Sequence, residues 1–190
     1  MKVFSVALLA LSLLSTPVMA DEYVIDKKGM HASIQFRIMH LGYSWLWGRF
    51  NDFDGEFSYD KNNISASKIN VTINTSSIDT NHAERDKHLR AEEFLDVEQF
   101  PQSSFVSTSL TMKDNGSIEL NGDFTLRGVT KPITIYMSSN LGEGNDPWGG
   151  YRAGFEGTTE LVLADYGILK DLGPASKKLD LFLSIEGIKK

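Results

Sequence analysis

Alternation of apolar and polar residues recurs along most of this chain, and it constrains the fold more than any other feature of the sequence. In residues 32–38, Ala, Ile, Phe and Ile alternate with Ser, Gln and Arg. A period of two places the apolar side chains on one face of a β-sheet and the polar ones on the other. Similar runs occur in residues 53–59, 68–74, 103–112, 117–126, 131–140, 151–163 and 178–188. The chain is therefore predicted to be all-β.

Turn signals separate these runs and indicate their number. Asp114-Asn115-Gly116 is a tight hairpin signal, and residues 142–147 form a loop rich in glycine. The run at 103–112 is less regular, because Phe105 points to one face and Val106, Leu110 and Met112 to the other. We expect that strand to be covered on both faces. About eight strands without alternating helices predict a closed barrel or a sandwich.

The first 20 residues are typical of a secretory signal peptide. Lys2 precedes an apolar run at 3–14, and residues 18–20 place small or compact side chains before a cleavage point between Ala20 and Asp21. The run is shorter than the ~20 residues that span a bilayer. Residues 21–190 would then be one exported domain. Because it contains no cysteine, its core and hydrogen bonds must hold it together without disulfides.

An aromatic segment at residues 41–48 interrupts the strand pattern. It contains Tyr43, Trp45 and Trp47, which is too aromatic for a solvated turn, and its two glycines disfavour a helix. We interpret it as a connection at the rim of the β-structure that joins the runs on either side of it. Those two runs are expected to be adjacent strands.

Residues 81–90 are the second departure from the strand pattern. They consist of good helix formers and contain no β-branched residue. Asn81 is a suitable N-cap, and Glu84 lies three residues later as its capping-box partner. A short polar helix is therefore predicted beside the β-structure.

Charge and histidine spacing argue against several classes of function. The net charge of −6 and the scattered Lys and Arg do not suit nucleic acid or anionic lipid head groups. The chain lacks a cysteine nucleophile and a Gly-x-Ser-x-Gly elbow. His31 and His40 flank one strand, and His82 and His88 are six residues apart, so neither pair has metal-ligand spacing. Glu84 and His88 fit a helix-stabilising pair better than an acid–base pair. No metal or cofactor is expected.

The barrel interior is the candidate site. An eight-stranded barrel can be filled by its own side chains or can hold one small ligand, and the apolar faces fit either case. The aromatic segment and the polar helix, as rim and lid, favour a cavity. Its lining is predicted to include Ile34, Phe36, Ile38, Phe57, Val71, Ile73, Phe105, Phe124, Ile133, Ile135, Phe155 and Leu181. The rim and head-group contacts are predicted to include Tyr43, Trp45, Trp47, Arg85 and His88.

The sequence also resembles the YceI family of exported lipocalin-like proteins. The matching segments are His40-Leu41-Gly42-Tyr43-Ser44-Trp45-Leu46, Asp52-Phe53-Asp54-Gly55, Val71-Thr72-Ile73-Asn74, residues 79–90, residues 126–132, Asp146-Pro147-Trp148-Gly149-Gly150 and residues 171–176. The resemblance implies an eight-stranded antiparallel lipocalin-like barrel with a short helix packed alongside. It also implies an apolar tunnel for a polyisoprenoid, such as an octaprenyl chain on a phenol or pyrophosphate head, and a possible homodimer. Many relatives have a basic residue before a late Asp-Phe-Gly, but residues 163–167 read Leu-Ala-Asp-Tyr-Gly here.

These observations predict a periplasmic binding or carrier protein that holds a polyisoprenoid, of polyprenyl or quinone type, and is not an enzyme. One alternative is an enzyme that acts on a lipid or quinone head group at the barrel mouth, with His88 or Glu84 as its acid or base. Another is a stress-responsive holdase that uses the exposed aromatic residues. The expected partner is the lipid, with no nucleic acid and no integral membrane segment after signal cleavage.

Overall fold

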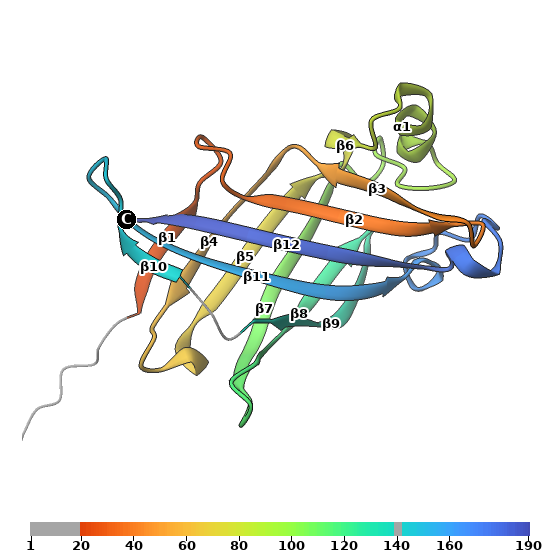
Figure 1. Ribbon diagram of the computed structural model, residues 1–190. Coiled ribbons are helices and arrows are strands. Elements are labelled where there is room, and N and C mark those ends of the chain that lie inside the picture. The colour runs from red at the N-terminus through yellow and green to blue at the C-terminus, as the bar shows by residue number, and fades with distance from the viewer. Residues whose placement is uncertain (1–19, 139–141) are drawn as a thin grey trace, which may run out of the picture.

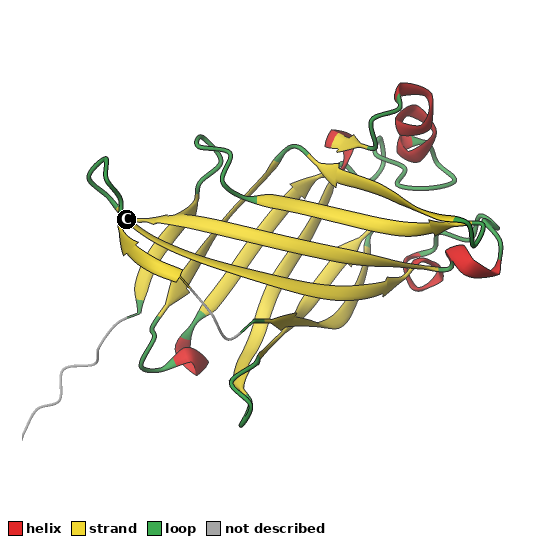
Figure 2. Cartoon of the chain, viewed as in Figure 1, coloured by secondary structure: helices red, strands yellow, loops and turns green. Residues whose placement is uncertain are grey.

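A computed structural model describes residues 20–138 and 142–190. The predicted signal peptide lies almost wholly outside the described residues, and Asp21, after the predicted cleavage point, begins the first strand. The described strands are β1 (Asp21–Ile25), β2 (Ser33–His40), β3 (Ser44–Phe50), β4 (Phe53–Tyr59), β5 (Lys68–Asn74), β6 (Ile78–Asp79), β7 (Gln102–Met112), β8 (Ile118–Leu126), β9 (Val129–Met137), β10 (Gly142–Asn145), β11 (Tyr151–Val162) and β12 (Lys178–Lys189). The helix α1 spans Ala83–Arg90, and the 3₁₀ turns are η1 (Ile64–Ala66), η2 (Thr75–Ser77), η3 (Leu163–Tyr166) and η4 (Pro174–Ser176) (Figure 1, Figure 2).

The strands close into an antiparallel barrel. Eight strands form the ring, in the order β11-β9-β8-β7-β5-β4-β1-β12, and β11 pairs with β12 to close it. The strands β2, β3 and β6 continue β1, β4 and β5 along the barrel. This is clearest at β12, whose residues 187–189 pair with β1 and whose residues 179–184 pair with β2 along the same edge. The predicted eight-stranded antiparallel barrel with one helix beside it is confirmed (Figure 1).

The aromatic segment is a strand, and in this respect the sequence interpretation was wrong. Residues 44–50 form β3, which pairs with β2 from Ile34↔Phe50 to His40↔Ser44. The runs at 32–38 and 53–59 are not paired with each other, because β4 pairs with β1 and β5. The period of two is present in β3, but Trp45 and Trp47 face outward and Gly48 faces inward between Leu46 and Phe50, so the usual apolar-inside signal is weak.

A bulge explains the irregular pattern of β7. The register of β7 against β8 shifts between Ser107 and Ser109, and the extra residue reverses the direction of the side chains that follow. Phe105 and Leu110 are therefore both buried, at 6% exposure each, while Val106 and Met112 are about half exposed. The prediction that this strand is covered on both faces was wrong, because all the buried residues lie on one face.

The helix α1 begins one residue later than expected and is held by polar contacts. His82 is the N-cap, and its Nδ1 accepts a hydrogen bond from Arg85 N at 3.2 Å. Asn81 is not the cap, because it adopts a left-handed conformation with φ of 60°. The buried Asp86 accepts hydrogen bonds from Thr80 N at 2.9 Å and Thr80 Oγ1 at 2.5 Å. Arg90 donates to the carbonyls of residues 76 and 78 at 2.7 Å each. These bonds fix α1 to β6 at one end of the barrel.

Large side chains fill the opposite half of the barrel. The rings of Tyr23 and Phe57 stack with centroids 4.8 Å apart, and Phe155 packs edge-on against Phe57 at 5.4 Å. Gly187 leaves room for Phe57, since a methyl group there would lie 2.7 Å from the ring carbon Cζ. This half is filled apart from a small void of about 20 Å³ beside Phe57 and Phe155, so the large internal space lies toward α1.

Candidate functional site

A cavity of about 540 Å³ occupies the half of the barrel nearest α1. Aliphatic and aromatic side chains dominate its walls, which come from β2, β3, β5, β6, β7, β8, β11 and β12. Two connections close over it, namely residues 80–101 with α1 and residues 163–176 with η3 and η4. The mouth of the cavity lies between these two connections. It is marked by exposed side chains in the lining, which include Leu41, His88 and Lys170.

The cavity brings together half of the predicted lining residues. Those that line it are Ile34, Phe36, Ile38, Ile73, Phe124 and Leu181. Those outside it are Phe57, Val71, Phe105, Ile133, Ile135 and Phe155. The second group faces inward too, but at the filled end of the barrel. On β5, for example, Ile73 reaches the cavity and Val71, one inward position further along, packs in the core. Alternation identifies the face of a strand, and it carries no information on position along the barrel.

The sequence interpretation missed residues in the two connections that cover the cavity. Phe94 and Leu95 are 7% exposed and follow α1, while Ile168 is 6% exposed and follows η3. All three line the cavity, as do Leu46 of β3 and Leu163 of η3. Their signal in the sequence is an apolar residue within a polar connection. A loop residue of that kind must be covered by something, but the sequence does not say by what.

The two serine hydroxyls in the wall already have protein partners. Ser103 Oγ donates to the carbonyl of Thr125 at 2.6 Å, and Ser176 Oγ donates to the carbonyl of Met39 at 2.5 Å. Both side chains line the cavity. Their hydroxyl protons are therefore directed to the backbone, and the interior presents carbon to a ligand. Such a space favours an apolar molecule held by dispersion and the hydrophobic effect.

Charged groups gather at the mouth. Glu93 joins the two covering connections, since its carboxylate contacts His88 Nε2 and lies 2.6 Å from Lys170 Nζ. Lys170 first and His88 second lower the pKa of Glu93 below its ordinary value. Arg85, also in the lining, donates to Thr80 Oγ1 and to the Thr80 carbonyl at 2.7 Å each. The predicted head-group residues Arg85 and His88 are thus at the mouth, among other charged groups.

Tyr43, Trp45 and Trp47 lie outside the cavity, whereas Phe50 at the end of β3 lines it. Tyr43 is 86% exposed, and Trp45 and Trp47 are 45% and 47% exposed. The Arg37 guanidinium lies 4.1 Å from the ring centroid of Trp45, and Trp47 packs against Phe182 at 5.2 Å. These three predicted rim residues therefore form an outer surface, and their neighbour Leu46 is the one that faces inward.

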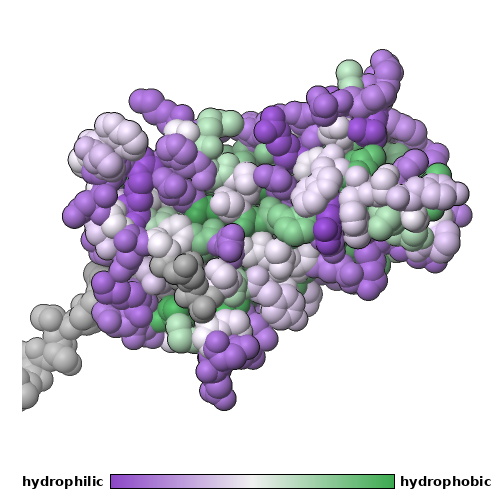
Figure 3. Space-filling model, in the orientation of Figure 1, coloured by the Kyte–Doolittle hydropathy of each residue, from purple (hydrophilic) through white to green (hydrophobic). Residues whose placement is uncertain are grey.

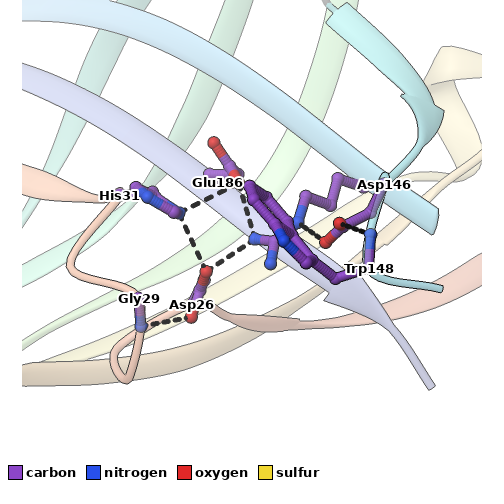
Figure 4. Close-up of polar contacts among 7 residues, drawn as sticks. Asp26, Gly29, His31, Asp146, Trp148 and Glu186 are labelled. Atoms are coloured by element: carbon purple, nitrogen blue, oxygen red, sulfur yellow. Dashed lines mark hydrogen bonds and ion pairs between the residues drawn. The ribbon is translucent and has the colours of Figure 1, made fainter. Parts of the chain in front are cut away.

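A partly buried ion cluster lies at the filled end of the barrel (Figure 4). Arg152 Nη1 lies 2.6 Å from both Asp26 Oδ2 and Glu186 Oε1, and Arg152 Nε contacts Asp146. His31 Nδ1 is 3.2 Å from Asp26 Oδ2. Arg152 is the main cause that lowers the pKa of Asp26. The ligand atoms of Asp26, His31 and Glu186 come within 4.8 Å of one another, but the guanidinium occupies the carboxylates, so the arrangement is a structural ion cluster that links β1, β11 and β12.

A closed antiparallel barrel with an apolar cavity at one end defines a lipocalin-like barrel. Residues 23–186 match the YceI-like domain family. The chain is 62% identical over 172 residues to a UPF0312 protein of Pseudomonas paraeruginosa, covering 90% of this chain and 88% of that protein. The chain thus belongs to the YceI family.

Solved structures share this fold. The YceI protein of Campylobacter jejuni superposes with a TM-score of 0.70 at 25% identity, over 80% of this chain and 90% of that one. A domain from Saccharophagus degradans described as polyisoprenoid-binding and implicated in plant cell wall breakdown gives a TM-score of 0.63 at 12% identity, over 88% of this chain and 98% of that domain. The second likeness concerns the fold alone.

Proposed function

We propose that this protein is a periplasmic carrier that holds a polyisoprenoid lipid in its barrel cavity. The observation that carries the proposal is an apolar space of about 540 Å³ whose wall hydroxyls are already bonded to the backbone. The volume is within the range of about 300–1,000 Å³ that is usual for small-molecule sites. The polyisoprenoid-binding description of a fold neighbour supports the same ligand class.

The energetics suit a prenyl chain. Each buried CH₂ group contributes about 0.8 kcal/mol, so a chain of several isoprene units needs few polar contacts to bind. Its head group would stay at the mouth, where Arg85, His88 and Lys170 line the cavity. A polyprenyl or quinone-type lipid satisfies both requirements.

The proposed location rests on the sequence of residues 1–20. The charged start, the apolar run and the small residues before Ala20 are the pattern of an exported protein. The absence of cysteine from the sequence suits a domain that folds in an oxidising compartment without disulfides. Within residues 20–138 and 142–190, no helix combines the length and the apolar character needed to cross a bilayer.

We infer binding and no catalysis, since the titratable groups at the mouth are engaged with one another. His88 pairs with Glu93, and Glu93 pairs with Lys170. The other predicted acid or base, Glu84, is exposed and is not in the cavity lining. The half-exposed Trp45 and Trp47 meet the minimum requirement of a holdase, but Arg37 covers Trp45. The possible homodimer stays a prediction that light scattering can check.

Organic extraction of the purified protein followed by mass spectrometry tests the carrier function. We expect a prenyl lipid in stoichiometric amount, and a clean extract from protein of native and recombinant sources would refute the proposal. Leu179→Trp and Leu183→Trp provide a matched pair, because both leucines are half-buried on the same face of β12 and only Leu179 lines the cavity. Leu179→Trp should reduce the bound lipid, and Leu183→Trp should leave it unchanged.

A further inference from the structure

The tip of the β2–β3 hairpin holds a leucine in an unfavourable conformation. Leu41 and Gly42 have φ of 52° and 84°, and the turn is closed by Tyr43 N, which donates to the His40 carbonyl at 2.9 Å. Positive φ at both central positions is the type I′ pattern, which favours Asn-Gly. Left-handed backbone is disfavoured for a side chain such as leucine. Leu41 is also 55% exposed, so burial does not compensate for its conformation.

Leu41 lies at the lip of the cavity and meets the opposite connection there. Its side chain is part of the cavity lining. A methyl group placed on Gly173 would lie 3.5 Å from Leu41 Cδ2, so the hairpin tip contacts the connection between η3 and η4. A strained and exposed leucine therefore lies at the lip of the cavity.

A second exposed leucine projects from that connection. Ile168 and Lys170 line the cavity, while Leu169 between them does not and is 78% exposed. Tyr43, beside the hairpin tip, is 86% exposed. Three large apolar or aromatic side chains are thus exposed to solvent around the opening. Figure 3 shows apolar side chains between polar ones at the end of the barrel that carries α1.

The charge around the mouth differs from that of the chain. The charged side chains in the lining are Arg85, Lys170 and Asp171, and Glu93 pairs with Lys170 at the mouth, so two positive and two negative charges balance there. The whole chain has a net charge of −6. The mouth is therefore free of the negative excess that would repel the phosphates of a lipid surface.

We propose that Leu41, Tyr43 and Leu169 form a docking rim that inserts into the surface of a phospholipid bilayer, so that the ligand passes between membrane and cavity without crossing water. The inference rests on the proposed carrier function. Exposing a prenyl chain to water costs about 0.8 kcal/mol of free energy for each CH₂ group. A mouth that touches the membrane therefore gives exchange its route of lowest barrier. The bilayer is the chosen partner because the rim surrounds the opening of the lipid cavity.

Transfer to vesicles tests the rim. The protein is loaded with a fluorescent polyprenol and mixed with phosphatidylcholine–phosphatidylethanolamine vesicles that carry a quencher lipid. Leu169→Asp should slow the transfer about tenfold or more, the effect of removing one leucine from an apolar environment. Met30→Asp is the control, since Met30 is 70% exposed in the loop between β1 and β2, far from the mouth, and should transfer at the wild-type rate.

Leu41→Asn adds a signature that a folding defect cannot produce. Asparagine suits the turn, so the variant should melt at a higher temperature than the wild type and yet transfer its ligand more slowly.

Equal transfer rates for wild type, Leu169→Asp and Leu41→Asn would overturn the docking rim, as would the same slowing in Met30→Asp. Because Leu169 does not line the cavity, Leu169→Asp should keep its extracted lipid. Absence of lipid from the wild type itself would refute the carrier function instead.

Discussion

Lys170 Nζ lies 2.6 Å from a carboxylate oxygen of Glu93, and this ion pair joins the two connections that cover the cavity. The residues are 77 positions apart in the chain, and each belongs to a segment that contributes apolar side chains to the lining. His88 contacts the same carboxylate from α1. The mouth of the cavity lies between these segments, so we expect the pair to affect the exchange of the ligand more than the stability of the barrel.

Glu93→Gln should therefore release ligand about two- to fivefold faster, as expected for loss of a solvent-exposed ion pair, with little change in the amount bound. Stopped-flow measurement of polyprenol release checks this. Glu160→Gln is the control, since Glu160 is also 2.6 Å from a lysine, Lys178, but outside the cavity. An equal acceleration in both variants would contradict the role of Glu93.

Acid should accelerate the release of ligand from the wild type, as the Glu93→Gln substitution does. Lys170 and His88 lower the pKa of Glu93 in the folded protein from its ordinary value of 4.5. Because the pKa of Glu93 is lowered, its ion pairs are fully present above pH 4.5, the ordinary pKa. They are lost as the pH falls through the lowered pKa of the folded protein. Release from the wild type should accelerate below about pH 4.5, while release from Glu93→Gln should show no such step.

Phe36→Asp should abolish lipid uptake while the barrel still folds. Phe36 is 6% exposed in the cavity wall, and a carboxylate there would repel an apolar chain and admit water. Trp45→Asp is the matched control, because Trp45 lies on the outer face of the neighbouring strand. Extraction and mass spectrometry of both variants, together with circular dichroism, check the prediction. Normal lipid content in a folded Phe36→Asp would contradict it.

Gly48→Ala should destabilise the protein by about 1–3 kcal/mol, the usual cost of overpacking a core. A methyl group at Gly48 would lie 2.7 Å from Phe36 Cε1 and 2.9 Å from Thr80 Cγ2. Denaturant unfolding measures the loss. Gly144→Ala is the control, since no described atom lies within 4 Å of a methyl group placed there, and its unfolding midpoint should be unchanged.

Asp26→Asn should lower the free energy of unfolding at neutral pH by about 2 kcal/mol, the usual contribution of a hydrogen bond to a charged group. Asp26 is 4% exposed and accepts from Gly29 N at 2.7 Å and from Arg152 at 2.6 Å. Arg152 and Gly29 lower the pKa of Asp26 below its ordinary value of 3.8. The contribution is therefore present above pH 3.8 and lost below it, so the wild type and the variant should converge in strong acid. A constant difference across the pH range would contradict this origin.

The alternation of residues determined the class of the fold and the inward face of most strands. On β8, Ile118, Leu120, Phe124 and Leu126 were placed on one face by periodicity alone, and all four are buried. This succeeds because the direction of a side chain on a strand depends only on local backbone geometry. The hairpin at Asp114-Asn115-Gly116 was equally local, and Gly116 has the positive φ that such a turn requires.

Tertiary structure alone decided where the interior is empty. Ile73 lines the cavity and Val71 does not, although both belong to the same face of β5, because the first lies beneath the covering connections and the second lies in the filled half. It also decided that β3 turns Trp45 and Trp47 outward, that a bulge brings Phe105 and Leu110 to one side, and that Glu93 forms an ion pair with Lys170. Each of these depends on contacts between segments distant in the chain, and a pattern with a period of two contains no information about such contacts.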